Sequence, residues 1–277
     1  MYKIKSYGKI NLSLEVLGKR EDGYHNIDTL MNSIDLFDEI NIKEISGEDL
    51  ILKSDNFEFP TDSSNLIYKA WEILKNYRDK AIGLEIFVKK NIPVAAGLAG
   101  GTSNACTVMK ALNEIWNLKL SKEELIDLSK PLGADSTFFF YEGLVRAEGI
   151  GEKITKFEEK LNYPLILINI GKPISSKEVY SKINNYSTGI VKSIVSNIND
   201  EEFLFKNVFN SMETISFKIY PELSSIKQEL INLGADLSLM SGSGPTIFGI
   251  FKDEKKRDLV YTKLLNKYNY VIKSKMI

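Results

Sequence analysis

The chain has 277 residues, of which 43% are hydrophobic and 26% are charged, with 36 Lys and Arg side chains against 37 Asp and Glu. This length suffices for a large core and favours two domains over one. The near-zero net charge gives no sign of a long basic surface, so we expect no nucleic-acid partner. The single cysteine excludes an intramolecular disulfide and fits a reducing compartment.

The first residues, MYKIKSYGKINLSLEVLGK, are basic but alternate instead of forming an apolar block. This pattern is not that of a signal peptide. No apolar run approaches the roughly 18 residues that a membrane span needs. We therefore predict a cytoplasmic protein that does not associate with a membrane.

The hydrophobic pattern of the N-terminal half predicts strands first and helices later. Strands are expected at residues 10–17, which alternate like a half-buried strand, at 38–45 and at 83–90, with a hairpin turn at 18–25. A helix is expected over 65–77, with Asp62, Ser63 and Ser64 as available N-caps. A second helix follows residue 103, with Ala105, Val108, Met109, Leu112 and Ile115 on one face.

In the C-terminal half the same patterns continue. A capping box at Ser121 and Glu124 predicts a helix over 121–130. Strands are expected within 137–157, joined at Gly143 and at 149–151, and then at 163–170, 246–251 and 270–274. Helices are expected at 177–185, 201–212, 223–233 and 253–268.

Strands and helices thus mix without regular βαβ alternation, which favours an α+β fold over a doubly wound sheet. We place the domain boundary between residues 150 and 165, giving domains 1–157 and 158–277. No Pro/Gly/Ser-rich linker marks this boundary.

The segment PVAAGLAGGTSNAC (93–106) places small residues directly before a predicted helix. Glycines let backbone amides approach a ligand closely, and a helix start offers free N–H groups with partial positive charge. Together these features suit phosphate oxygens. The segment is neither a Walker A loop, because no Lys follows the glycines, nor a GxGxxG fingerprint. An anion site and a tightly packed turn both remain open.

Other candidate residues have ordinary explanations when they are taken one at a time. Asp135 suits a general base but also a helix-end cap. Lys9 is one of many lysines, and a lone histidine such as His25 is more often structural than catalytic. Tyr180 suits a buried helix aromatic, and Asn65 suits an N-cap.

Three segments in the expected order resemble the motifs of the GHMP kinases, which phosphorylate small alcohols with ATP. Residues 93–106 resemble the central motif, and LMSGSGPTIFGIF (239–251) resembles the third. KINLSLEVLGKREDGYHNIDTLMNSIDL (9–36) resembles the N-terminal signature of one member, whose acceptor is linked to cytidine diphosphate. Because the three segments span nearly the whole chain, they are far more specific than one glycine loop.

The resemblance implies a two-domain GHMP kinase fold. Its N-terminal, ATP-binding domain would be ribosomal protein S5 domain 2-like, and its C-terminal domain would be a ferredoxin-like α/β sandwich. It also implies ATP with Mg²⁺ as counter-charge. No dedicated carboxylate cage for the metal is evident, so phosphates, water and the Thr102 or Ser103 hydroxyl are expected to hold it. In the reaction it implies that Asp135 is the base and that Lys9 is the catalytic cation that keeps Asp135 ionised.

The resemblance also assigns the binding residues. Nucleotide contacts are implied for Asn65 and for Pro93, Val94, Ala95, Ala96, Gly97, Leu98, Ala99, Gly100, Gly101, Thr102 and Ser103. Tyr24 would stack on the cytosine, His25 would hydrogen-bond to it, and Tyr180 would cover its other face. The implied acceptor is the 2-hydroxyl of 4-diphosphocytidyl-2-C-methyl-D-erythritol, a small molecule of the non-mevalonate route to isoprenoid precursors.

Several positions depart from the family pattern. Ala99 and Thr102 replace Gly and Ser, Gly8 replaces Ala, and Ser136–Thr137 replaces Val-Pro after Asp135. None of these changes removes a reacting group. Ala99 restricts the loop if its backbone needs a positive φ.

Two alternatives are compatible with parts of the pattern. One is a different small-alcohol kinase of the same fold, acting on homoserine, mevalonate or a sugar, and DGYH (22–25) argues against it. The other is a nucleotide-binding protein without catalysis, and Lys9 and Asp135 argue against it. The sequence leaves a monomer and a homodimer equally open.

Overall fold

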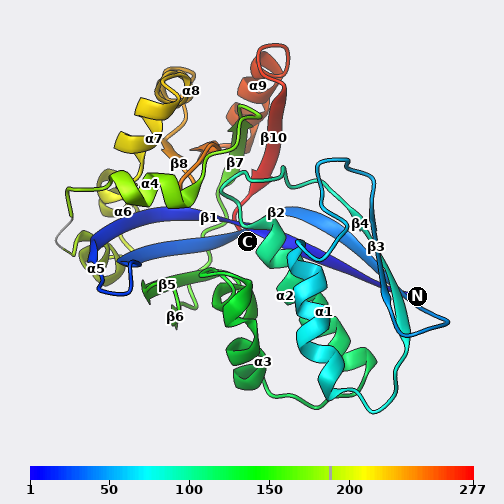
Figure 1. The fold of residues 1–277 in the computed structure, drawn as a ribbon. Coiled ribbons are helices and arrows are strands. Elements are labelled where there is room, and N and C mark those ends of the chain that lie inside the picture. Colours follow the sequence, from blue (N-terminus) through cyan, green and yellow to red (C-terminus); the bar gives the residue numbers. More distant parts are fainter. Residues whose placement is uncertain (187–188) are drawn as a thin grey trace. The chain divides into compact units, whose positions relative to one another are not determined.

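The computed structural model describes residues 1–186 and 189–277 (Figure 1). The chain forms two compact units, each assembled from three segments. The first unit comprises Met1–Gly8, Leu36–Val94 and Ala99–Tyr141, and the second comprises Lys9–Asp35, Ala95–Leu98 and Glu142–Ile277. Two long strands, β1 (Tyr2–Lys19) and β2 (His25–Ile45), contribute residues to both units. The predicted boundary at residue 157 stays a prediction.

In the first unit, strand β4 (Gly83–Lys89) lies between two neighbours. It pairs antiparallel with β2, from Glu39 opposite Lys89 to Ile45 opposite Gly83, and parallel with β3 (Leu50–Ser54). Alternate side chains of β4 are fully buried, which supplies the apolar face that a sheet needs to pack on helices. Helices α1 (Leu66–Leu74) and α2 (Gly100–Ile115) lie side by side in this unit (Figure 1).

Side-chain N-caps mark the starts of two helices of the first unit, α1 and α3. Asn65 caps α1, because its Oδ1 accepts a hydrogen bond from the backbone N–H of Ile67 at 2.8 Å. This corrects the expected caps Asp62, Ser63 and Ser64, which lie one to three residues too early. The capping box of Ser121 and Glu124 at α3 (Lys122–Ser129) is confirmed. The short 3₁₀ helices η1 (Lys75–Tyr77), η2 (Lys130–Leu132) and η3 (Thr137–Phe140) complete the unit.

In the second unit, the N-terminal part of β2 pairs with β5 (Leu144–Gly149), and β5 pairs with β6 (Lys153–Lys156). A separate antiparallel sheet has the order β10-β7-β9-β8. Its strands are β7 (Pro164–Asn169), β8 (Leu237–Met240), β9 (Ile247–Ile250) and β10 (Tyr270–Lys275). The helices between β7 and β8 are α4 (Ser176–Lys182), α5 (Ile190–Ser196), α6 (Glu201–Asn207), α7 (Glu213–Ile219) and α8 (Glu222–Asn232), and α9 (Glu254–Leu264) joins β9 to β10.

This second sheet follows the sequence strand, helices, strand, strand, helix, strand, and the first of its strands lies between the fourth and the third. That order is the ferredoxin-like arrangement. Apolar side chains of α4, α8 and α9 pack with those of β7 and β9 in one buried cluster. The expected ferredoxin-like C-terminal domain and the α+β class are confirmed.

Three local predictions are wrong. The helix expected over 201–212 ends at Asn207, because Val208 is extended, and the next helix begins at Glu213. Residues 137–140 form the 3₁₀ helix η3 and not a strand, because Ser136 O accepts the N–H of Phe139 and the chain turns. An apolar run buried on all sides does not distinguish strand from helix by period. Strand β1 is also not half-buried: every residue from Gly8 to Val16 is buried, including its polar face.

None of the helices formed by the described residues is long and apolar enough to cross a bilayer.

Candidate active site

The glycines of the segment 93–103 serve different purposes. Gly97 has φ 75°, and a Cβ there would lie 2.4 Å from the backbone oxygen of Ser241 and 2.8 Å from that of Gly244. Ser241 Oγ donates to Gly97 O at 2.9 Å. Close backbone contact with the turn 241–245 therefore explains this glycine, and the packing interpretation holds at this position.

Gly100 and Gly101 differ from each other. A Cβ on Gly100 would lie 2.9 Å from Ile92 Cγ2, so Gly100 is also explained by packing. A Cβ on Gly101 would find its nearest neighbour, Leu66 Cδ1, at 3.9 Å, and Gly101 is exposed. Internal packing does not require a glycine at 101. The space beside Gly101 is open to a ligand that lies against the backbone.

Helix α2 begins without a side-chain cap. Its N-cap residue, Ala99, has φ 54° and ψ 29°, in the left-handed region, and makes no capping hydrogen bond. The sequence left open whether residue 99 has a positive φ, and it does. This conformation is less favourable in free energy for alanine than for glycine, because alanine has a Cβ. The first N–H groups of a helix have no intrahelical acceptor, and here no side chain covers them from the N-cap. This geometry suits an anion.

The remaining residues of the segment range from exposed to buried. Val94, Ala95 and Gly101 are exposed, Pro93, Gly97, Ala99 and Thr102 are half-buried, and Ala96, Leu98, Gly100 and Ser103 are buried. Ser103 Oγ donates to Tyr7 O at 2.6 Å and lies 2.7 Å from Ser6 Oγ, and its N–H donates to Ala99 O at 2.9 Å. Ser103 therefore anchors α2 to β1, which leaves Thr102 as the hydroxyl nearer the surface.

Asp135 lies in the turn between η2 and η3 and is half-buried. One face of α2 contacts this turn through two hydrogen bonds and also lies close to Gly133. Thr102 Oγ1 would lie 3.3 Å from a Cβ on Gly133, Cys106 Sγ donates to Ser136 O at 3.6 Å, and Lys110 Nζ donates to Phe139 O at 3.0 Å. Residues four apart on a helix share a face, so α2 positions the whole turn that carries Asp135. Burial raises the pKa of the Cys106 thiol to about 12.

Lys9 belongs to the second unit and lies on the buried polar face of β1. Its Nζ donates to Asn11 Oδ1 at 2.6 Å, and its backbone N–H donates to Leu98 O at 3.1 Å. Asn11 Nδ2 donates to Thr29 Oγ1 at 2.9 Å. Asn11 is therefore a further candidate site residue, which the sequence patterns did not indicate. Lys9 and Asp135 fall in different units, so their expected pairing stays a prediction.

Three aromatic candidates also lie in the second unit. The rings of His25 and Tyr180 are stacked, with centroids 5.1 Å apart and planes 22° apart. Burial lowers the pKa of His25, and the charge of Lys19 lowers it further, which favours the neutral imidazole. Tyr24 is 59% exposed. Tyr186, which the sequence did not single out, is tilted against His25 at 6.3 Å. The structure brings His25 and Tyr180 together, and their contacts with a cytosine stay a prediction.

Asn65 is 7% exposed and caps α1, as its ordinary explanation predicted. Its Nδ2 also donates to Pro60 O. A contact of Asn65 with adenine stays a prediction. Among the described residues, no group of three or more His, Cys, Asp and Glu side chains is placed to hold a metal ion.

Family models match both halves of the chain. The model of the GHMP kinases N terminal domain matches residues 65–143, and that of the GHMP kinases C terminal domain matches residues 194–270. The chain belongs to the GHMP kinase family, and it is a kinase.

Curated relatives narrow the comparison within that family. A protein of Finegoldia magna is 47% identical over 278 residues, covering 100% of both chains, and one of Clostridioides difficile is 41% identical, covering 98% of this chain and 95% of its own. Both are named 4-diphosphocytidyl-2-C-methyl-D-erythritol kinase. A crystal structure of 4-(cytidine 5'-diphospho)-2C-methyl-D-erythritol kinase matches with a TM-score of 0.83 at 26% identity, covering 99% of each chain. The mevalonate kinase of L. major, at 17% identity and a TM-score of 0.76, shares the fold.

Proposed function

We propose that this kinase transfers the γ-phosphoryl group of ATP to the 2-hydroxyl of 4-diphosphocytidyl-2-C-methyl-D-erythritol. The observation that carries the proposal is the full-length likeness, at 40–47% identity, to relatives named for this activity. The stacked rings of His25 and Tyr180 support it, because a planar cytosine is the kind of group that aromatic side chains hold. Tyr24, exposed and adjacent to His25 in sequence, is proposed to stack on the same base.

The start of α2 is proposed to bind the phosphates of ATP. Gly101 supports this role, because a ligand and not internal packing explains its missing side chain. The proposal extends to the segment 93–103 as the nucleotide loop and to Asn65 beside the adenine. Within the loop, Thr102 is favoured over Ser103 for a hydroxyl contact, since the Ser103 hydroxyl is already hydrogen-bonded to Tyr7 O.

Mg²⁺ is proposed as the accompanying cation. The metal is proposed to be held mainly by phosphate and water oxygens. Thr102 is the candidate protein ligand. When bound, the cation neutralises charge on the phosphates.

Asp135 is proposed as the general base. It accepts the proton of the 2-hydroxyl while that oxygen bonds to the γ-phosphorus and the bond from phosphorus to the ADP oxygen breaks. Lys9 is proposed to stabilise negative charge, with its ammonium oriented by Asn11 at 2.6 Å. The cytoplasmic location and the monomeric or homodimeric state stay predictions.

A coupled assay of ADP release tests the proposal. The chain is given ATP and Mg²⁺ with 4-diphosphocytidyl-2-C-methyl-D-erythritol, homoserine, mevalonate or no acceptor. We expect release with the cytidine-linked acceptor alone, and loss of release when EDTA removes the metal. Faster release with homoserine or mevalonate contradicts the proposed acceptor, and ATP binding without release for any acceptor contradicts catalysis.

Replacing Tyr24 tests the recognition of the base. Stacking on an aromatic side chain contributes about 1–3 kcal/mol per base, so Tyr24→Ala is expected to raise the KM of the cytidine-linked acceptor roughly fivefold to a hundredfold. The KM of ATP should not change. Equal weakening of both substrates would remove Tyr24 from base recognition.

A further inference from the structure

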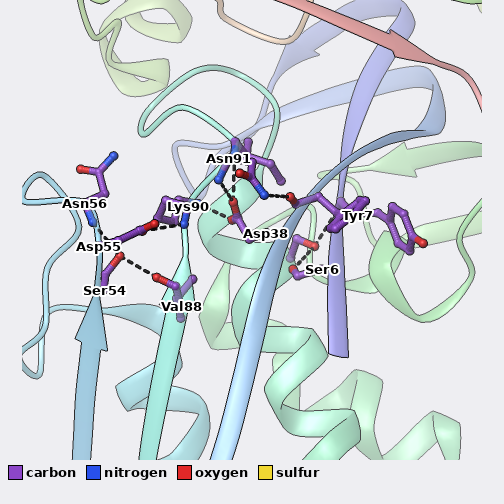
Figure 2. A network of polar contacts seen from close by, with 12 residues as sticks. Ser6, Tyr7, Asp38, Ser54, Asp55, Asn56, Val88, Lys90 and Asn91 are labelled. Carbon is purple, nitrogen blue, oxygen red and sulfur yellow. Dashed lines mark hydrogen bonds and ion pairs between the residues drawn. The ribbon is translucent and has the colours of Figure 1, made fainter. Parts of the chain in front are cut away.

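Three successive backbone N–H groups just after β4 are all accepted by carboxylates. Lys90 N donates to Asp55 Oδ1 at 2.9 Å, and the N–H groups of Asn91 and Ile92 donate to Asp38 Oδ1 at 2.8 and 2.9 Å (Figure 2). Pro93 follows, which has no N–H. We call Asp38 and Asp55 the carboxylate pair. All of these residues belong to the first unit.

The carboxylate pair accepts the backbone N–H groups of residues 90–92, which follow directly after the last residues of β4 paired in the sheet. The β2–β4 ladder ends at Glu39 opposite Lys89, and the next residue of β2 is Asp38. The β3–β4 ladder ends at Ser54 opposite Val88, and the next residue is Asp55. The side chains of Asp38, from the β2 side, and Asp55, from the β3 side, therefore bind residues 90–92, where the chain leaves the sheet toward the segment 93–103.

Asp38 is completely buried, and its second oxygen, Oδ2, forms an ion pair with Lys90 Nζ, whose side chain is only 3% exposed (Figure 2). Burial lowers the pKa of Lys90, and the charge of Asp38 opposes this change. Asn91 Nδ2 adds a hydrogen bond to Phe37 O at 2.8 Å. Hydrogen bonds to an ionised acceptor are stronger than neutral ones, and a buried ion pair with all its partners is held in one geometry.

Residues 90–92 in turn support the first residue of α2. Ile92 is 1% exposed, and its Cγ2 would lie 2.9 Å from a Cβ on Gly100. Lys90 Nζ would lie 3.4 Å from the same point. A shift of Ile92 would therefore move Gly100, and with it the N–H groups at the start of α2.

We propose that Asp38 and Asp55 are positioning residues for the nucleotide. By accepting the N–H groups of residues 90–92, they hold this segment in place, and the segment packs against Gly100 at the phosphate-binding start of α2. Neither residue touches the ligand in this role. The proposal rests on the proposed function, because it takes the start of α2 to be the phosphate site.

The test compares the KM of ATP with the KM of the acceptor. Asp38→Ala removes the acceptor of two N–H groups, and misplacing a binding group by about 1 Å costs up to a hundredfold. We expect a rise of about tenfold to a hundredfold in the KM of ATP and little change in that of the acceptor. Loss of stability alone would reduce the amount of active enzyme, and hence the apparent kcat, and would leave both KM values unchanged.

A double variant separates the backbone hydrogen bonds from the charge. Asp38→Asn with Lys90→Gln replaces the ion pair by two neutral amides, and the Asn oxygen can still accept from Asn91 and Ile92. We expect it to bring the KM of ATP back to within about threefold of the unmodified value, which corresponds to about 0.7 kcal/mol. If the double variant is as impaired as Asp38→Ala, positioning through these N–H groups is wrong.

The neighbouring ion pair is a matched control. Glu39 and Lys89 lie one residue away on the same two strands, at 3.0 Å, and both are about half exposed. Glu39→Gln is expected to leave the KM of ATP unchanged. A similar rise in this control would show that any charge lost from these strands has the same effect, and would overturn the proposal.

Asp55 keeps the test decisive if Asp38→Ala does not fold. Asp55 is exposed, so Asp55→Ala is expected to fold, and it removes the acceptor of one N–H group. We expect the KM of ATP to rise about threefold, and Asp55→Asn to restore it. An unchanged KM in Asp55→Ala would overturn the proposal for that residue.

Calorimetric titration of the unmodified chain with ATP and Mg²⁺ comes first. Absence of ATP binding would overturn the proposed function itself. Normal binding by the unmodified chain and equally normal binding by Asp38→Ala and Asp55→Ala would overturn only the positioning role.

Discussion

Helices α1 and α2 lie side by side in the first unit and begin in opposite ways. Asn65, at φ −72° and ψ 139°, caps α1 with its own side chain. Ala99, at φ 54° and ψ 29°, precedes α2 and caps nothing. Two glycines then open α2, where α1 has Leu66 and Ile67. The first helix is capped by a side chain of its own chain, whereas no side chain of the N-cap residue covers the start of the second.

The difference teaches how to separate structural glycines from glycines that serve a ligand. Ser121 caps α3 with its side chain, as Asn65 caps α1, so two helices of the first unit have side-chain N-caps. At α2 a capping side chain would occupy the place where an anion approaches the N–H groups. Gly101 has room for a side chain and yet has none. Four changes test this contrast, from the largest expected effect to the smallest.

The largest effect is expected from Asp135→Asn, in the turn that α2 positions. An amide cannot take the proton of the hydroxyl, so turnover should fall by at least about a hundredfold, the scale of general-base catalysis. The KM of ATP should stay near its original value, because the start of α2 is intact. Unchanged turnover would remove Asp135 from the chemistry and limit the role of α2 to binding.

Gly101→Val should weaken ATP binding about tenfold or more, because its branched side chain would cover backbone that the phosphates approach. The fold should tolerate it, since the nearest atom to a new Cβ is 3.9 Å away. Calorimetry measures the affinity, and a thermal melt checks the fold. Gly101 is the better test than Gly100, where a Cβ would meet Ile92 at 2.9 Å and disturb packing as well. Normal ATP affinity in Gly101→Val would mean that α2 begins on a packing turn.

Asn65→Ala removes the cap of α1 and should lower the free energy of unfolding by about 1 kcal/mol. We also expect the KM of ATP to rise a few-fold, as the proposed place of Asn65 beside the adenine requires. Ser121→Ala is the matched control, because it removes a cap of the same kind from α3. Both variants should lose similar stability. If the KM of ATP is the same in both, Asn65 is a cap and nothing more.

The smallest effect is expected from Ala99→Gly. The left-handed conformation costs an alanine about 1–2 kcal/mol, and the greater freedom of an unfolded glycine offsets roughly half of this. The free energy of unfolding should therefore rise by about 0.5–1 kcal/mol, measured by denaturant titration. Ala81→Gly, at an exposed position without a positive φ, should instead lower it. A loss of stability in Ala99→Gly would show that the alanine methyl group contributes packing that outweighs its strain.

Most elements of the fold follow from local patterns, and the failures have local causes. Strict alternation and helical spacing predicted β4, α2 and α9 near their observed positions, because each buries one face. The strand predicted at Thr137–Phe140 failed because a run of three consecutive aromatic residues shows neither the period of a strand nor that of a helix. The start of α1 was predicted ambiguously, because Asp62, Ser63 and Ser64 are equally good capping residues directly before Asn65, and the structure selects Asn65.

The site was predictable where its chemistry is contiguous in the sequence. The segment 93–103 stands out by composition, whereas Asn11 and Asp38 gain their meaning from partners far along the chain. One signal was available for Asn11. Lys9, Asn11 and Glu15 share a face of β1, and Glu15 Oε1 accepts the N–H of Ile190 at the start of α5 at 3.0 Å. Buried polar side chains need hydrogen-bond partners. A row of polar residues on one face of a fully buried strand therefore indicates residues whose side chains bind specific partners.

Cys106 gives this protein a practical advantage as an object of spectroscopy. It is the single cysteine of the chain, it is buried, and its thiol pKa is raised to about 12, so it carries almost no reactive thiolate at neutral pH. A cysteine introduced on the surface would then be the one group that a thiol-directed dye or spin label modifies. Phe57, 97% exposed in the first unit, and Leu259, 69% exposed in the second, are suitable positions. A chain labelled at both positions would report the separation of the two units with and without ATP. Cys106 would not need to be replaced, because its buried thiol would not react with the label.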